Sequence, residues 1–165
     1  MNVQSFFQTL EQLPPSVFIR GSAWLGAMIN VAHLVCLVLL AGSVLIVDLR
    51  LLGGGMTRQP VAQIARDARP WFILALVGMA LTGIPQVLST AMKQYYSPFF
   101  WQKMEFLLVA IIYTLTVRHR VTMADESRVG RFWSALVALI SIGLWTGAAI
   151  NARLKIGRAS CRERV

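Results

Sequence analysis

Residues 23–47, AWLGAMINVAHLVCLVLLAGSVLIV, contain no Asp, Glu, Lys or Arg. The hydrocarbon core of a bilayer is about 30 Å thick, and a helix needs roughly 20 mainly apolar residues to cross it. Three later runs are also apolar and long enough to cross, at residues 71–88, 99–117 and 132–150. The sequence therefore predicts four membrane-spanning helices.

The overall composition indicates that lipid is the solvent of this chain. Of its 165 residues, 56% are hydrophobic and only 14% are charged, whereas soluble domains carry about 25% charged residues. We expect an all-α integral membrane protein, with residues 1–154 forming a single four-helix transmembrane bundle. The lipid bilayer is the expected partner, and no nucleic-acid partner is expected.

A short amphipathic segment precedes the first span. Its apolar residues recur at helical spacing, and Pro14 and Pro15 end the pattern. The apolar positions are Val3, Phe6, Phe7, Leu10 and Leu13. The segment lacks the basic start of a cleaved signal peptide. We expect a short N-terminal helix lying in the membrane interface.

The last eleven residues, KIGRASCRERV at 155–165, differ abruptly from the apolar helix before them. They resemble the read-through translation of a common short-read sequencing adapter. A natural basic tail is the alternative, since basic tails commonly contact anionic partners. We expect residues 155–165 to be a non-native tail.

The arginines are distributed unevenly between the two sides of the predicted bundle. One side carries Arg50, Arg58, Arg66, Arg69, Arg118, Arg120, Arg128 and Arg131, which we assign to two loops. The other side carries Arg20, Lys93, Lys103 and Arg153. By the positive-inside rule, the Arg-rich loops are expected in the cytoplasm of a bacterial inner membrane, with both termini in the periplasm.

His33 lies near the middle of the first span and is its most informative residue. It shares one helical stripe with Gly26, Asn30, Leu37, Leu40, Val44 and Asp48. Ionisable groups at membrane depth are rare and face protein. We expect a polar interior centred on Asn30 and His33. A ligand or proton-handling role for His33 and a structural hydrogen bond to a neighbouring helix both fit.

Three further features of the spans are candidates for polar or helix contacts. Lys103, near the start of the third span, can either reach inward or extend to the headgroups. Asp48 ends its helix, where the dipole disfavours an anion, so we expect a structural ion pair with Arg118. Gly143 and Gly147 form a GxxxG pair that suggests a homo-oligomer contact.

The sequence assigns no catalytic residue. It has no phosphate-binding glycine loop, no nucleophile elbow and no pair of histidines at metal-binding spacing. An enzymatic activity is therefore neither predicted nor excluded.

Two segments carry a family resemblance. HLVCLVLLAGSVLIVDLRLLG, residues 33–53, and SPFFWQKMEFLLVAIIYTLTVRH, residues 97–119, resemble a family of uncharacterised four-helix bacterial membrane proteins. Its marks are the first-helix histidine, a Gly-Ser step, the DLRLLG end and a lysine opening the third helix, matched here by Lys103. The family's Gly-Arg near the end of the fourth helix is replaced here by Asn151-Ala152-Arg153.

A more distant resemblance is to the membrane-embedded protoporphyrinogen oxidase and other haem-linked four-helix membrane proteins. It rests on the intramembrane His33 and on Lys103 at the head of a later helix. It implies a haem b or porphyrin cofactor, with His33 as the iron ligand and Lys103 and Asn30 as further cofactor-binding residues. The leading expectation is an inner-membrane protein of unknown activity that serves as a binding or accessory module, and a haem- or porphyrin-binding redox protein or enzyme using His33 is the alternative.

Overall fold

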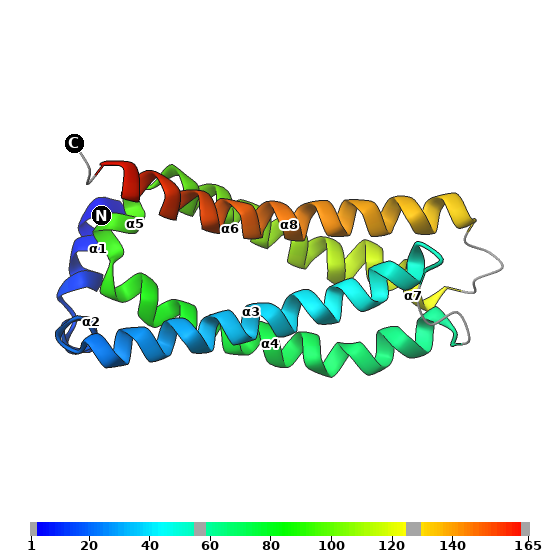
Figure 1. Cartoon of the computed structure of the whole chain (residues 1–165), viewed down its shortest axis with the longest axis horizontal. Coiled ribbons are helices and arrows are strands. Elements are labelled where there is room, and N and C mark those ends of the chain that lie inside the picture. The colour runs from blue at the N-terminus through cyan, green and yellow to red at the C-terminus, as the bar shows by residue number, and fades with distance from the viewer. Residues whose placement is uncertain (1–2, 55–58, 125–129, 163–165) are drawn as a thin grey trace. The chain divides into compact units, whose positions relative to one another are not determined.

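The computed structural model describes residues 3–54, 59–124 and 130–162, with the backbone alone for Ala23 and residues 151–162. Throughout these ranges the regular elements are helices (Figure 1). They are α1 (Val3–Gln12), α2 (Pro14–Gly21), α3 (Ala23–Leu51), α4 (Val61–Ser89), α5 (Ala91–Tyr95), α6 (Pro98–Tyr113), the π-helical turn η1 (Thr114–Arg118), α7 (His119–Met123) and α8 (Arg131–Arg162).

Four stretches of helix are long and apolar enough to span a membrane. They are Trp24–Leu51, Val61–Ser89, Pro98–Met123 and Arg131–Ile150. The predicted all-α fold class is confirmed, and the four helices are compatible with the four spans that the sequence predicts.

The helices extend beyond the predicted spans, most clearly in α4, which begins ten positions before Trp71. Val61 and Ile64 are buried at helical spacing, so burial stabilises a helix that composition alone does not mark as a span. Arg66 and Arg69 consequently lie on α4 and not in the loop to which we had assigned them. Several other arginines of the predicted loops, such as Arg50 and Arg118, are also helical.

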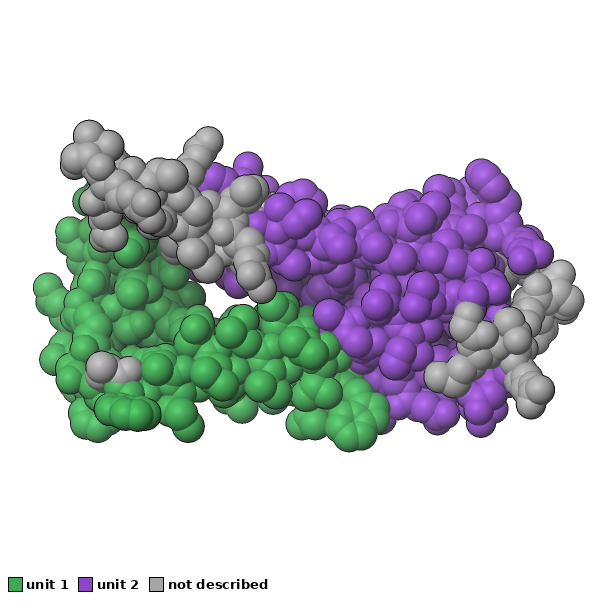
Figure 2. All heavy atoms as spheres, viewed as in Figure 1, with its two compact units in different colours: residues 1–40, 71–98 green, residues 41–70, 99–165 purple. Residues whose placement is uncertain are grey.

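The chain forms two compact units, which Figure 2 distinguishes by colour. Unit 1 comprises Met1–Leu40 and Trp71–Pro98, and unit 2 comprises Ala41–Pro70 and Phe99–Val165. Both α3 and α4 therefore contribute one part to each unit.

Unit 2 has an apolar core at one end of its helices. The core consists of Val47, Leu51, Val61, Ile64, Val137 and Ala138, with Leu52, Ala65, Ala68, Tyr113 and Val121 packed against it. On the other side of α3, Leu45, Ile46 and Leu49 are exposed. Large apolar side chains on the surface suit a protein whose surroundings are lipid.

The C-terminal end of α3 depends on a glycine. Gly53 has φ +84°, a conformation that side-chain-bearing residues rarely adopt. The Gly54 amide donates to the Leu49 carbonyl at 3.0 Å, which closes the helix. A Cβ on Gly53 would lie 3.2 Å from a guanidinium nitrogen of Arg131. The final glycine of the DLRLLG motif thus has two physical reasons to be glycine.

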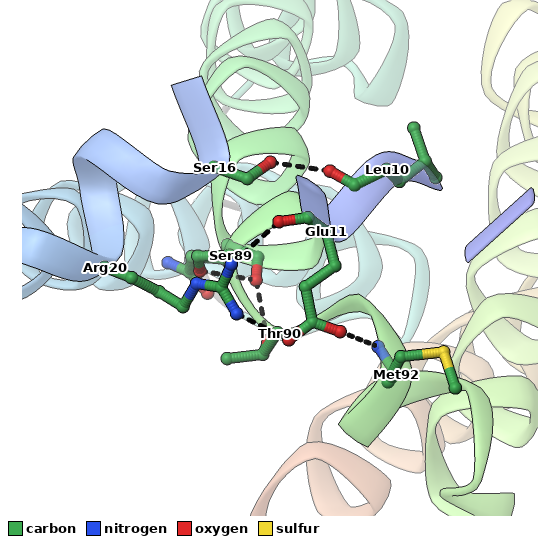
Figure 3. Close-up of polar contacts among 8 residues, drawn as sticks. Leu10, Glu11, Ser16, Arg20, Ser89, Thr90 and Met92 are labelled. Atoms are coloured by element: carbon green, nitrogen blue, oxygen red, sulfur yellow. Dashed lines mark hydrogen bonds and ion pairs between the residues drawn. The ribbon is translucent and has the colours of Figure 1, made fainter. Parts of the chain in front are cut away.

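In unit 1, α1 and α2 form a helical hairpin held to α5 by polar contacts (Figure 3). The Glu11 carboxylate pairs with Arg20 of α2 at 2.8 Å and accepts from the Met92 amide of α5 at 3.2 Å. The Ser16 hydroxyl donates to the Leu10 carbonyl at 2.7 Å across the α1–α2 corner. Phe7 packs against Tyr95, with ring centroids 5.4 Å apart.

The helical spacing of residues 3–13 therefore predicted a helix correctly, since α1 covers Val3–Gln12. The rest of the hairpin is exposed and partly apolar, with Val3, Phe6, Val17 and Phe18 on its surface. α1 ends at Gln12, just before Pro14 and Pro15, as predicted. A second helix, α2, begins at Pro14, because the first turn of a helix does not need the amide hydrogen that proline lacks.

Candidate functional site

His33 is held by α4 within unit 1. Its Nδ1 lies 2.8 Å from the Thr82 hydroxyl oxygen. The Thr82 hydroxyl donates its own hydrogen to the Gly78 carbonyl at 2.7 Å. Since a hydroxyl has one hydrogen to donate, Nδ1 of His33 must be the donor to Thr82. In the neutral ring the lone pair is then on Nε2.

Two glycines of α4 allow α3 to approach closely at this point. A Cβ on Gly83 would lie 3.3 Å from Cε1 of His33, and a Cβ on Gly78 would lie 2.6 Å from Sγ of Cys36. The imidazole therefore rests directly against the α4 backbone. Asn30, which the stripe placed beside His33, is exposed. It is three residues away, about 60° around the helix, and so lies at the edge of the buried sector.

Asp48 and Arg118 are in contact in the buried interior of unit 2. Arg118 Nε lies 2.8 Å from Asp48 Oδ1, with the Asp48 side chain fully buried and that of Arg118 8% exposed. A terminal nitrogen of Arg118 donates to the Val44 carbonyl at 3.0 Å. Ser141 of α8 is also fully buried, close to Asp48, and its hydroxyl oxygen has no hydrogen-bond partner among the described residues. The Asp48–Arg118 ion pair thus joins two spans, and a polar residue of a third span lies beside it.

A second polar layer lies beside this cluster. Trp145 donates its indole hydrogen to the Thr114 hydroxyl at 3.3 Å, and the Tyr113 hydroxyl donates to the Val137 carbonyl at 3.1 Å. Both bonds connect α8 to the helix that contains η1. Buried polar groups with partners fix the relative rotation of the helices that carry them.

The π-helical turn η1 explains how Arg118 enters the interior. Ala110, Thr114, Arg118 and Thr122 are all buried and follow one another in steps of four. In an α-helix each such step drifts about 40° around the axis, so three steps drift about 120°. One additional residue in a π turn corrects about 100° of that drift. The turn therefore keeps the four residues on one face.

The remaining predicted residues take no part in the contacts described above. Lys103 is half-buried on α6 in unit 2, whereas His33 belongs to unit 1. Gly147 lies against Phe106, since a Cβ there would be 3.1 Å from that ring, and Gly143 is exposed. One glycine of the GxxxG pair thus makes a contact between two helices of the same chain.

Thr82 and Ser141 had not been predicted as the neighbours of His33 and Asp48. Thr82 and Ser141 are ordinary hydroxyl residues of apolar helices, and spacing alone does not show which ones meet a charged or ionisable partner. The sequence does contain a signal for the buried position of Arg118. Small and polar residues recur at every fourth position from Ala110 to Thr122. That period is characteristic of a helix with a widened turn.

Four apolar spans with polar residues inside and large apolar residues outside define a multi-pass membrane protein of the all-α class. The chain belongs to DUF6644, a family of unknown function whose model matches residues 21–158. No curated protein and no solved structure matches it.

Proposed function

We propose that this chain is a membrane-embedded binding module whose ligand is held by Nε2 of His33. The observation that supports the proposal is the hydrogen bond of 2.8 Å between Nδ1 of His33 and Thr82. Histidines that coordinate a metal characteristically donate their second ring hydrogen to a neighbouring group, which fixes the tautomer. Thr82 serves as that neighbouring group here.

Haem b is the ligand that this arrangement fits best. A haem iron takes four ligands from its porphyrin, so a single protein imidazole can hold it. Contact with Gly83 restricts the rotation of the ring, as a fixed axial ligand requires. When bound, haem supplies one-electron redox chemistry. This chain would supply the imidazole, its tautomer and an apolar environment.

The first prediction is that the protein, purified with an adequate haem supply or reconstituted with haem, has a Soret band. His33→Ala should abolish the band and leave the helical circular dichroism unchanged. Thr82→Val should keep some haem but weaken its affinity by about 10-fold or more, because it removes only the group that orients the ligand.

Cys36→Ala is the matched control, because Cys36 lies one turn from His33 and also faces α4. It should leave the Soret band unchanged. A colourless wild-type protein that also fails to bind added haem or protoporphyrin would contradict the proposal. His33 and Thr82 would then be an interhelical hydrogen bond that stabilises the fold.

We further propose a bacterial inner-membrane location with the Arg-rich ends of the helices in the cytoplasm. The excess of arginine on one side supports this orientation. The second prediction is that reporter fusions after Gly54 and before Gly130 both report the cytoplasm. Fusion at the N-terminus should report the periplasm. A periplasmic signal from either loop fusion would refute the orientation.

A further inference from the structure

Four exposed arginines are adjacent in the chain, or in contact, with residues at the end of unit 2 that holds its apolar core. Arg66 and Arg69 lie on α4 beside Ala65 and Ala68, which pack on that core. Arg120 precedes Val121, which packs on the same core, and Arg131 lies against Gly53 at the end of α3. We refer to Arg66, Arg69, Arg120 and Arg131 as the basic collar.

Among the described residues at this end of unit 2, basic side chains outnumber acidic ones. Among the described residues at this end of unit 2, the acidic side chains are Asp48 and Asp67, and Asp48 is buried against Arg118. The basic ones are the collar, Arg50 and Arg118, so the sum is 6 − 2 = +4. No ion pair joins Arg66, Arg69 or Arg120 to another described residue.

Collar residues lie next to the ends of the apolar runs of α4 and α8, where a membrane span meets the headgroup layer. The most apolar part of α4 begins directly after Arg69, and α8 continues from Arg131 into Phe132 and Trp133. Those two aromatic side chains are 76% and 62% exposed. Arginine beside exposed tryptophan is typical of the boundary between the hydrocarbon core and the headgroup layer. The lipid-facing surface of the helices is therefore continuous with the collar.

We propose that the basic collar binds the phosphate of anionic phospholipids. Clusters of basic residues directly beside a membrane span attract anionic headgroups, and the planar guanidinium group forms paired hydrogen bonds to phosphate oxygens. The collar has the charge, exposure and depth that this ligand requires. The inference is independent of His33, which belongs to unit 1.

Native mass spectrometry of the full chain tests the proposal with phosphatidylglycerol and phosphatidylcholine of identical acyl chains. The wild-type protein should bind phosphatidylglycerol more tightly. Arg66→Gln and Arg69→Gln should each lower that affinity about fivefold and leave phosphatidylcholine binding unchanged. Both side chains are exposed, so the thermal unfolding midpoint in detergent should stay constant.

Lys93→Gln is the matched control, since Lys93 is an exposed cation on α5 in unit 1. It should leave the preference for phosphatidylglycerol intact. Equal affinity for the two lipids, or an undiminished preference in the Arg66→Gln/Arg69→Gln double variant, would overturn the proposal. Displacement of phosphatidylglycerol by millimolar inorganic phosphate would also overturn it, because the site would then recognise free phosphate.

Discussion

Replacing Arg118 with alanine is expected to lower the free energy of unfolding by about 3–5 kcal/mol, since it leaves a buried charge without its partner. The Asp48 side chain is fully buried, and its Oδ1 lies 2.8 Å from Arg118 Nε. The substitution also removes the donor to the Val44 carbonyl. Denaturation of the detergent-solubilised protein by increasing SDS, followed by circular dichroism, measures the change.

Arg120→Ala provides the matched control, because Arg120 is an exposed arginine two residues further along the chain. Its effect should stay within about 0.5 kcal/mol. An Asp48→Leu/Arg118→Met double variant should recover most of the lost stability, since apolar replacement of both partners removes the desolvation penalty. If Arg118→Ala unfolds no more easily than Arg120→Ala, the pair does not stabilise unit 2.

Substituting alanine for Gly78 should destabilise unit 1 by about 1–3 kcal/mol through overpacking. The added methyl carbon would lie 2.6 Å from Sγ of Cys36, well inside van der Waals contact. Either α3 moves away from α4 or the cysteine changes rotamer. Such a shift also disturbs the contact of His33 with Thr82, which lies one turn away on the same pair of helices. The same SDS titration reports the loss of stability.

Cys36→Ala should rescue Gly78→Ala, because it removes the atom that the new methyl group meets. Gly143→Ala is the control, since a Cβ on Gly143 meets no atom within 4 Å. It should be neutral or slightly stabilising, as alanine favours helix more than glycine does. A Gly78→Ala variant as stable as Gly143→Ala would mean that the two helices do not pack closely there.

The sequence predicted the spans because the bilayer demands long apolar helices and few other patterns satisfy that demand. The start of α4 was missed because this segment lacks the continuous apolar composition of a membrane span. Val61 and Ile64 are buried against other helices, and the arginines between them and Trp71 resemble a loop by composition. Amphipathic periodicity was the better guide to that boundary than hydropathy.

The candidate site was only partly accessible to sequence reasoning. His33, Asp48 and Arg118 are conspicuous because ionisable residues inside apolar helices are rare. Thr82, which is bonded to His33, and Ser141, which lies buried beside Asp48, are not conspicuous, because hydroxyl residues are common in such helices and their neighbours depend on helix rotation. Asn30 illustrates the same limit, because a rotation of about 60° around the helix from His33 already places a side chain outside the buried face.

The π turn Thr114–Arg118 has a consequence for comparing members of the DUF6644 family. A widened turn arises when one residue is added to an α-helix, and it changes the helical phase of everything that follows. Relatives with a regular α-helix at this position should therefore have one residue fewer between the counterparts of Ala110 and Thr122. A one-residue gap in an alignment of this helix would thus mark a real structural difference, with the arginine rotated relative to its aspartate.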